Sequence, residues 1–244
     1  MGKKGIILLG QLGIILLVGA GCLLGNYRRN QAVAIAGSLI TKETERSTIT
    51  EKTEAGLAAV MQEIIAERKA TVVIDAGHGG EQPGCVVGKT MEKDVNLAIA
   101  LALKEELENR GIGVILTRSG DRDVQLANRT VYAKLIFADY FVSIHCNAYS
   151  WDRSVRGFQC FYYQSEEGKK LSEEITQLVK EREIRIRQAE EAGFRVLRES
   201  AIPAILIETG YLTNYGDRTA LTSGDYQRDM AVIIADGINK VLQG

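Results

Sequence analysis

Short apolar runs alternate with amphipathic stretches over most of the chain. From Thr71 onward the runs predict strands over residues 71–75, 113–117, 140–144, 157–163 and 204–207. Helical spacing of apolar residues predicts helices over residues 94–109, 125–137, 165–182 and 226–242. Such alternation is typical of a largely parallel sheet covered by helices on both faces. We therefore expect an α/β fold, in which residues 70–244 form a single domain with a mostly parallel central sheet flanked by helices.

The N-terminus has a different pattern, which predicts a transmembrane helix before this domain. After residues 1–4, residues 5–25 are apolar or glycine except for Gln11. This length is close to the roughly 20 residues that span a bilayer as a helix, whereas a signal peptide has a shorter apolar core. An A-x-A sequence at residues 34–36 lies far beyond the apolar stretch. We expect an uncleaved membrane anchor, and secretion after signal cleavage is the alternative.

A connector of mixed charge, residues 26–69, joins the anchor to the domain. Apolar residues recur at helical spacing over residues 54–69, which indicates a linker or stalk that is partly helical. Lys3 and Lys4 lie before the apolar segment and two arginines, Arg28 and Arg29, lie after it. Because basic residues flank both ends, charge does not decide the orientation in the membrane.

Composition excludes several classes of partner. The formal net charge is −1, so no basic surface for nucleic acid is indicated. Residues 84–90 resemble a phosphate-binding loop, but the motif is one residue short and Pro83 stands where its first glycine belongs. No strand precedes it as that motif requires, so we expect no nucleotide. The four cysteines form no C-x-x-C pair; a bridge between Cys85 and Cys160 stays open, and isolated buried thiols are the default.

The chain has two histidines, and each follows an apolar run. His78 comes shortly after residues 71–75, and His145 comes directly after residues 140–144. A third run, residues 204–207, leads directly to Glu208. In open α/β sheets the functional crevice lies outside the carboxyl ends of the strands. We therefore expect these three side chains to converge at one edge of one sheet.

A catalytic zinc site needs three protein ligands and one open position. His78 and His145 supply two, and Glu92 is the leading candidate for the third; Asp94 competes but is better interpreted as the N-cap or first-turn residue of the helix that follows. Glu208 is then the candidate general base. Each residue also has an ordinary alternative: a hydrogen-bonded structural histidine, a solvated carboxylate or a salt bridge. The residues alone predict a metal-dependent hydrolase with an unknown substrate.

Four longer motifs carry a resemblance to a known family. The four motifs are Asp75-Ala-Gly-His-Gly-Gly80, Glu92-Lys-Asp-Val-Asn-Leu97, Ser143-Ile-His-Cys-Asn-Ala148 and Ile207-Glu-Thr-Gly-Tyr-Leu-Thr-Asn214. In this order and spacing they resemble the zinc-dependent N-acetylmuramoyl-L-alanine amidases of bacterial cell walls. Three shorter stretches support the resemblance: Leu116-Thr-Arg118, Ala138-Asp139 and Phe194-Arg-Val-Leu-Arg198 before Pro203. The resemblance covers about residues 71 to 244.

The resemblance implies an activity and residue roles. It implies that the substrate is peptidoglycan, cut at the amide between the lactyl group of N-acetylmuramic acid and the L-alanine of the stem peptide. By motif, Zn²⁺ is held by His78, Glu92 and His145, and Glu208 is the catalytic glutamate. Further candidates near the substrate or behind the ligands are Asp75, which could orient a ligand histidine, and Arg118, Ser143 and Asn147. Peptidoglycan lies outside the cytoplasmic membrane, so the N-terminus is expected inside and the catalytic domain outside.

The chain also departs from some relatives, and two other functions stay open. Only eleven residues separate His145 from Gly157, so a helical insertion that occludes the zinc in some relatives is expected to be absent. No wall-binding repeat is visible in the sequence. The alternatives are a non-catalytic wall-binding module of the same fold, and a zinc hydrolase that acts on another exported amide.

Overall fold

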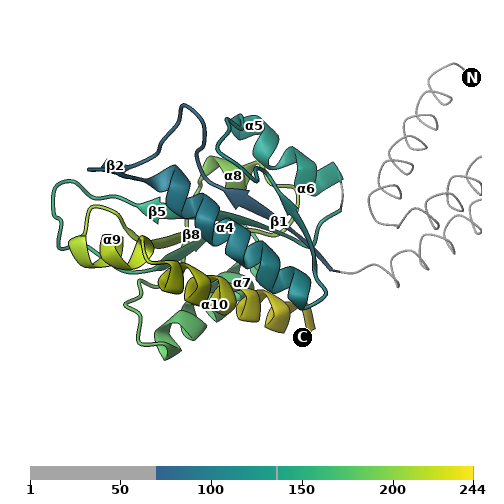
Figure 1. Ribbon diagram of the computed structural model, residues 1–244. Coiled ribbons are helices and arrows are strands. Elements are labelled where there is room, and N and C mark those ends of the chain that lie inside the picture. Colours follow the sequence, from purple (N-terminus) through teal and green to yellow (C-terminus); the bar gives the residue numbers. More distant parts are fainter. Residues whose placement is uncertain (1–69, 136, 244) are drawn as a thin grey trace, which may run out of the picture. The chain divides into compact units, whose positions relative to one another are not determined.

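The apolar runs form the inner strands of a six-stranded sheet (Figure 1). The computed structural model describes residues 70–243 apart from Ile136, and only the backbone of Tyr132 and Leu135. Across the sheet the order is β4 (Gly113–Leu116), β1 (Thr71–Ala76), β5 (Tyr140–Asn147), β8 (Ala204–Tyr211), β6 (Gln159–Tyr162) and β7 (Glu190–Glu191). The first four are parallel, β6 is antiparallel to β8, and β7 is parallel to β6. The prediction of a mostly parallel sheet is confirmed.

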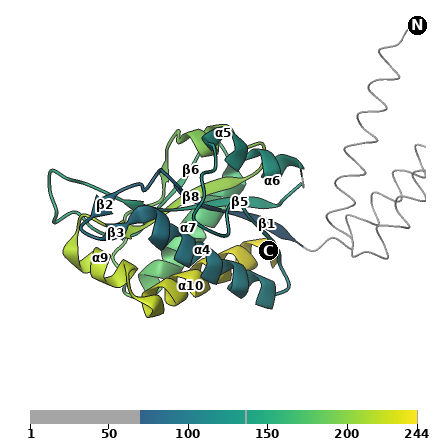
Figure 2. The ribbon, with the colours of Figure 1, turned by 45° about the horizontal axis from the view of Figure 1, so that its top comes forward.

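Helices cover both faces of the sheet, as Figure 2 shows. One face is covered by α4 (Glu92–Asn109), α7 (Glu166–Glu181) and α10 (Gly224–Gln243). The other carries shorter helices, α5 (Leu126–Arg129), α6 (Val131–Leu135) and α8 (Arg195–Arg198). The remaining elements are α9 (Tyr215–Leu221), which follows β8, and a hairpin of β2 (Val86–Val87) and β3 (Thr90–Met91) before α4.

Alternate residues of each inner strand serve different apolar cores. In β1, Val72 and Ile74 pack in the larger core beneath α4, α7 and α10, whereas Val73 packs in the smaller core. In β5, Val142 and Ile144 face the larger core, and Phe141 faces the smaller one. This period of two is the geometry of an extended strand. Since both faces are covered, the strands are apolar throughout, which explains why they were visible as continuous apolar runs.

The long helices follow from amphipathic sequence and defined ends. Ser165 precedes α7, and its side chain accepts a hydrogen bond from the backbone N–H of Gly168 at 3.0 Å. Leu171, Ile175 and Val179 then recur every four residues and are fully buried. An N-cap serine followed by an apolar stripe is the expected pattern for a surface helix packed on a sheet.

Several predicted boundaries are wrong, and most of the differences lie at one edge of the sheet. Strands 140–144 and 204–207 extend to Asn147 and Tyr211, so His145 and Glu208 lie within strands rather than after them. The helix predicted from Asp94 begins at Glu92, which places Asp94 in its first turn. The helix predicted over residues 125–137 is divided at Thr130 into α5 and α6. Polar residues here were expected to end the strands, but the backbone ladder continues through His145 and Glu208.

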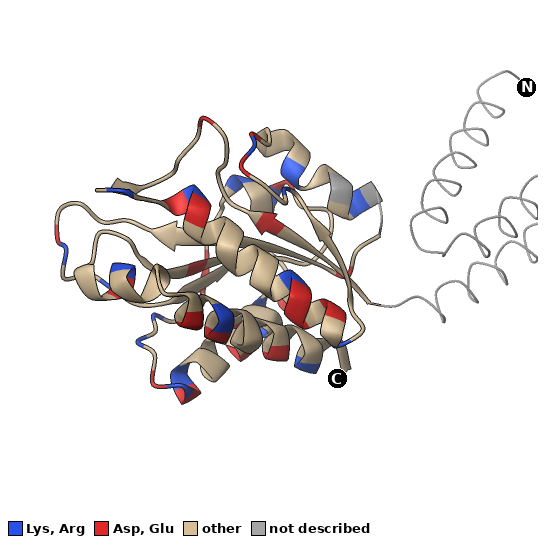
Figure 3. Cartoon of the chain, in the orientation of Figure 1, with Lys and Arg blue, Asp and Glu red and all other residues tan. Residues whose placement is uncertain are grey.

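Charged residues of both signs are interspersed along α4 and α10 (Figure 3), consistent with the near-zero net charge. Residues 70–244 form one compact unit. The predicted cytoplasmic end (1–4), transmembrane segment (5–25) and linker (26–69) lie outside the described residues. Within the part of the chain that the structure describes, no helix is both long and apolar enough to cross a bilayer.

Candidate metal centre

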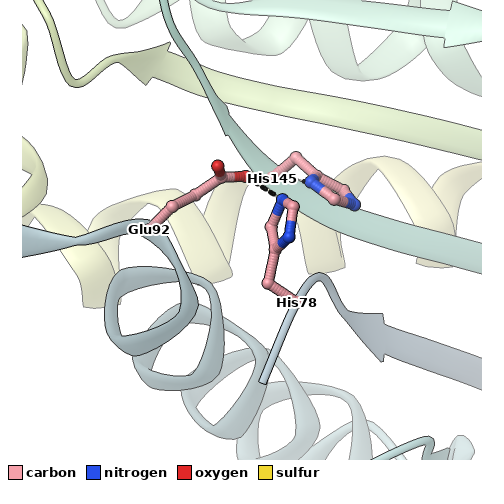
Figure 4. A group of neighbouring side chains, drawn as sticks. All are labelled: His78, Glu92 and His145. Atoms are coloured by element: carbon pink, nitrogen blue, oxygen red, sulfur yellow. Dashed lines mark hydrogen bonds and ion pairs between the residues drawn. The ribbon is translucent and has the colours of Figure 1, made fainter. Parts of the chain in front are cut away.

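His78, Glu92 and His145 come together at the carboxyl edge of the sheet (Figure 4). His78 lies in the loop after β1, Glu92 is the first residue of α4, and His145 lies in β5. One ligand atom from each residue lies within 4.8 Å of the other two. Glu92 Oε1 is 3.2 Å from His78 Nε2 and 2.9 Å from His145 Nδ1. Two imidazole nitrogens and a carboxylate oxygen therefore surround one point.

The loop that carries His78 has an unusual backbone. His78 has φ 61°, in the left-handed region that few residues other than glycine adopt. Two arginines hold the loop by its carbonyl groups: Arg129 Nη2 donates to His78 O at 2.9 Å, and Arg118 Nη2 donates to Gly77 O at 2.9 Å. Backbone strain of this kind persists only where the surroundings enforce it. These hydrogen bonds hold the backbone at His78 in this conformation.

Two glycines leave room for the three side chains. A Cβ at Gly77 would lie 2.3 Å from His145 Cε1, so only glycine lets the histidine ring pass over the loop. A Cβ at Gly84 would lie 2.4 Å from Glu92 Oε2 and 2.7 Å from His78 Cδ2. Gly84 also has φ +69°. At these two glycines the backbone thus lies closer to the clustered side chains than any residue with a Cβ would allow.

Glu92 is held as a carboxylate. Its Oε2 accepts a hydrogen bond from the Cys85 N–H at 2.9 Å, and its Oε1 accepts one from the Cys146 N–H at 3.2 Å. Asn96, one turn along α4, also donates to Oε1 at 3.3 Å. Burial raises the pKa of Glu92, but hydrogen bonds with His145 and His78 outweigh it, and the pKa lies well below its ordinary value. The residue is therefore charged at neutral pH, as a metal ligand must be.

His145 lies against His78 with the ring centroids 5.0 Å apart and an interplanar angle of 79°. Burial lowers the pKa of His145, but the hydrogen bond to Glu92 and the charge of Glu208 raise it, and the net shift is upward. The main chain is fixed too, because Thr209 Oγ1 donates to His145 O at 3.0 Å.

Glu208 is the direct neighbour of His145 in the sheet. The two residues pair in register between the parallel strands β5 and β8, so their side chains project from the same face. Glu208 is 9% exposed, and its Oε2 has no hydrogen-bond partner among the described residues. Burial raises the pKa of Glu208 to about 7. An unpaired buried carboxylate oxygen with such a pKa is suited to accepting and releasing a proton.

Asp75 and Ser143 lie behind the site rather than in contact with the histidines. Ser143 Oγ donates to Asp75 Oδ2 at 2.8 Å, and Thr117 Oγ1 donates to Oδ1 at 2.7 Å. Arg129 Nη1 forms a buried ion pair with Asp75 Oδ1 at 2.7 Å. Among the described residues no hydrogen bond joins Asp75 to a histidine; Asp75 is linked to the His78 backbone through Arg129, whose Nη2 donates to His78 O. Removing one partner of such a buried pair typically costs about 3–5 kcal/mol.

Arg118 is fully buried and serves the backbone. It donates to the carbonyl oxygens of Ala76, Gly77 and Lys93 at 2.7–2.9 Å, and so ties the His78 loop to the start of α4. Arg129 has a similar role. The sequence does not predict this role, because an arginine in a short helix is typical of a solvent-exposed helix face. Its partner Asp75 is 54 positions away in sequence.

Asn147 forms a local hydrogen bond at the end of β5, and the described cysteines form no disulfide. Asn147 is half-buried at the end of β5, and its Oδ1 accepts a hydrogen bond from the Ala148 N–H at 2.8 Å. Cys85, Cys146 and Cys160 are free thiols, so no bridge joins Cys85 to Cys160. Cys146 is buried, with Sγ 3.4 Å from Thr209 Oγ1. Residues 148–157, between β5 and β6, contain no helix.

The family is shown by comparison with known proteins. A family model for N-acetylmuramoyl-L-alanine amidase matches residues 72–240. The uncharacterized protein YqiI of Bacillus subtilis is 38% identical over 173 residues, 69% of this chain and 83% of YqiI. The N-acetylmuramoyl-L-alanine amidase LytC of the same organism is 35% identical over 171 residues, 68% of this chain and 34% of LytC.

A solved structure agrees with both the sequence and the fold. The N-acetylmuramoyl-L-alanine amidase AmiC2 of Nostoc punctiforme is 40% identical, with a TM-score of 0.69, and the match covers 72% of this chain and 98% of AmiC2. The match to LytC spans about a third of that protein and the match to AmiC2 nearly all of its solved chain. The residues matched by the family model, 72–240, include all three clustered residues and Glu208. The chain belongs to the N-acetylmuramoyl-L-alanine amidase family.

Proposed function

We propose that the chain is a zinc-dependent peptidoglycan hydrolase that cleaves the amide between the lactyl group of N-acetylmuramic acid and the L-alanine of the stem peptide. One observation carries this proposal. In a chain of this family, the ligand group His78, Glu92 and His145 stands beside a buried carboxylate, Glu208, that has an unpaired oxygen and a strand position next to His145. A ligand group and an adjacent base are the two components that metal-assisted amide hydrolysis needs.

The three side chains fit a zinc ion by chemistry and by spacing. Two histidines and one carboxylate are a ligand set found in catalytic zinc sites, which keep the fourth position open. Ligand atoms at the usual bond lengths from a tetrahedral zinc lie roughly 3.3 Å apart. The contacts of Glu92 Oε1 with the two imidazoles, 3.2 and 2.9 Å, are close to that value. Gly77 and Gly84 leave space that a side chain would fill.

The reaction then follows from what the chain's own residues do. Bound zinc supplies Lewis acidity, which polarises a carbonyl and lowers the pKa of water to about 7. Glu208 takes a proton from the attacking water and passes it to the departing amine of L-alanine. The water oxygen ends in the lactyl carboxylate. Burial matters here, because a pKa of about 7 lets Glu208 act in both directions near neutral pH.

We also propose that residues 5–25 anchor the enzyme in the cytoplasmic membrane, with the N-terminus inside and the catalytic domain outside. The support is the length and apolar character of that segment together with the location of peptidoglycan. Secretion after signal cleavage is the alternative, and fractionation of cells with an antibody against the catalytic domain separates the two. Anchoring predicts full-length protein in the membrane fraction, whereas cleavage predicts a shorter soluble form.

The function is tested by digesting purified peptidoglycan with the full-length chain loaded with zinc, followed by mass analysis. Free stem peptides that begin with L-alanine, together with intact glycan strands, are expected. Cuts confined to the glycan or to bonds within the stem would point to another hydrolase. No release at all, with retention of the protein on the wall, would instead support the non-catalytic wall-binding module.

A further inference from the structure

A row of polar side chains crosses three neighbouring strands beside the metal centre. His145 of β5 pairs with Glu208 of β8, and Glu208 in turn pairs with Gln159 of β6. Residues paired directly across a sheet project from the same face. Gln159, the first residue of β6, is only 4% exposed, although its two chain neighbours, Phe158 and Cys160, belong to the larger apolar core on the opposite face. The reaction described above accounts for the first two members of this row but leaves Gln159 without a role.

Gln159 holds an arginine in a fixed orientation. Arg187 Nε donates to Gln159 Oε1 at 3.1 Å, and the Arg187 N–H donates to Phe158 O at 2.7 Å. The other end of the amide is fixed as well, because Gln159 Nε2 donates to Glu190 Oε2 at 3.0 Å. With both amide atoms engaged, Gln159 cannot turn away. The Arg187 guanidinium is therefore tied at Nε to the end of the row.

The two terminal nitrogens of Arg187 are open. Among the described residues, neither Nη1 nor Nη2 has a hydrogen-bond or ion-pair partner, and the side chain is exposed. Glu190, which accepts a hydrogen bond from the same Gln159 amide, forms no ion pair with Arg187. The charges of Arg187 and Glu208 both act on the phenol of Tyr211. Burial raises the pKa of Tyr211, the positive charge of Arg187 lowers it, and the negative charge of Glu208 raises it. The Arg187 guanidinium thus lies near Glu208 in a fixed orientation, with both Nη groups free to donate hydrogen bonds.

We propose that Arg187, positioned by Gln159, is a subsite for the α-carboxylate of the second stem residue and makes the enzyme prefer an acidic over an amidated stem. A guanidinium with two free Nη donors matches a carboxylate in geometry and in charge. The inference rests on the proposed function, because it takes its ligand from that substrate. In peptidoglycan stems the second residue is a glutamate joined through its γ-carboxyl, so its α-carboxylate is free unless the cell amidates it.

The distances agree with this assignment. Neighbouring strands lie about 4.8 Å apart, so the line from His145 across β8 to Gln159 spans about 10 Å. Two extended residues, the alanine and the glutamate after the scissile bond, span roughly 7 Å, and the carboxylate adds to that reach. The sugar side of the bond offers no such partner, because the lactyl carboxyl of muramic acid is itself the scissile amide and its acetamido group is neutral. The anion near the cut therefore belongs to the peptide.

The test uses two muramyl tripeptides that differ only in a free α-carboxylate or a carboxamide on the D-glutamate. For the zinc-loaded full-length chain, kcat/KM is expected to favour the carboxylate form at least about tenfold, the size of one charge-assisted contact. Arg187→Gln should bring the ratio close to one, and Arg187→Lys should retain part of it. Arg185→Gln is the matched control, since Arg185 is exposed and two positions away, and it should keep the full preference.

Binding separates this subsite from the proposed reaction. In the Glu208→Gln background the affinities of both tripeptides are measured by calorimetry, which requires no turnover. The carboxylate form should bind at least about tenfold more tightly, and the added Arg187→Gln change should remove the difference. Equal affinities in the parent, or a preference that survives Arg187→Gln, would overturn the subsite even if the amidase activity stands. Preferential binding without cleavage by the unmodified chain would keep the subsite and contradict the proposed reaction.

Discussion

His145 of β5 and Glu208 of β8 occupy the same position in adjacent parallel strands. The main chains of such neighbours lie about 4.8 Å apart, and paired side chains project side by side. One residue belongs to the ligand group and the other has an unpaired carboxylate oxygen. The ladder of backbone hydrogen bonds thus sets the separation between the ligand group and Glu208, and it does so with strands rather than with loops.

The first prediction concerns the base. Glu208→Gln keeps the shape of the side chain but cannot accept a proton from water, so turnover should fall by about 10² to 10⁴. Zinc affinity should stay within a few-fold of the parent, since the side chain at this position is not among the three ligands. Steady-state rates on a muramyl tripeptide and zinc titration of the same preparation check both. Near-normal rates in the variant would assign the base to another residue.

The second prediction concerns the ligands. His145→Ala removes one of three donors, so the variant should lose both bound zinc and activity. Asp94→Asn is the matched control, because Asp94 is an exposed carboxylate in the first turn of α4, two positions from Glu92. It should bind one equivalent of zinc and retain activity. Metal analysis of dialysed protein decides, and zinc loss in Asp94→Asn would mean that the ligand set is misassigned.

The third prediction uses two glycines with similar backbones. Gly84 has φ +69° and Gly88 has φ +62°, so alanine at either position brings a comparable conformational cost of about 1 kcal/mol. Only at Gly84 would the new Cβ collide with Glu92 and His78; at Gly88 it meets nothing within 4 Å. Gly84→Ala should therefore weaken zinc binding at least tenfold, whereas Gly88→Ala should leave it unchanged. Equal zinc affinities of the two variants, measured by competition with a chelator, would contradict the steric argument.

The fourth prediction concerns alkaline pH. Burial raises the pKa of the Cys160 thiol, whereas an exposed thiol in the unfolded chain titrates near 8.5. Above that pH the unfolded state loses the proton first. The free energy of unfolding is therefore expected to carry a contribution that is complete below about pH 8.5 and falls by about 1.4 kcal/mol per pH unit above it.

Cys160→Ala should remove that part of the slope. Urea denaturation of the parent and the variant between pH 7 and pH 10, at one fixed zinc concentration, measures it. The two proteins should show a constant difference in unfolding free energy below pH 8 and converge above it. Parallel curves over the whole range would show that the thiol is not protected from ionisation in the folded protein.

Much of the fold and the ligand group was predictable from local sequence. Residues 71–75, 140–144 and 204–207 are buried on both faces, so they appear as apolar runs, and parallel strands bring their carboxyl ends to one edge. Since the chain has only two histidines, both at such positions, their convergence could be inferred before any geometry was known. The extension of these strands through His145 and Glu208 could not, because polar residues within a strand look locally like its end.

The roles of Arg129, Gln159 and Arg187 depend on contacts between distant parts of the chain. Arg129 acquires its role by reaching Asp75, and Gln159 acquires its position because β6 runs antiparallel to β8. Nothing in the sequence near Arg187 indicates that its guanidinium is held by an amide from another strand. Periodicity reports which face of an element is apolar, but it does not report the register between elements, and these roles follow from register.

The bond that the chain cleaves can be identified from the fate of the water oxygen. A defined muramyl tripeptide is hydrolysed by the zinc-loaded chain in ¹⁸O-labelled water, and both products are analysed by mass spectrometry. We expect one ¹⁸O atom in the lactyl carboxylate of N-acetylmuramic acid and an unlabelled tripeptide with a free L-alanine amine. Incorporation of ¹⁸O into a peptide carboxylate instead would show that the chain cuts within the stem and is not an amidase of this bond.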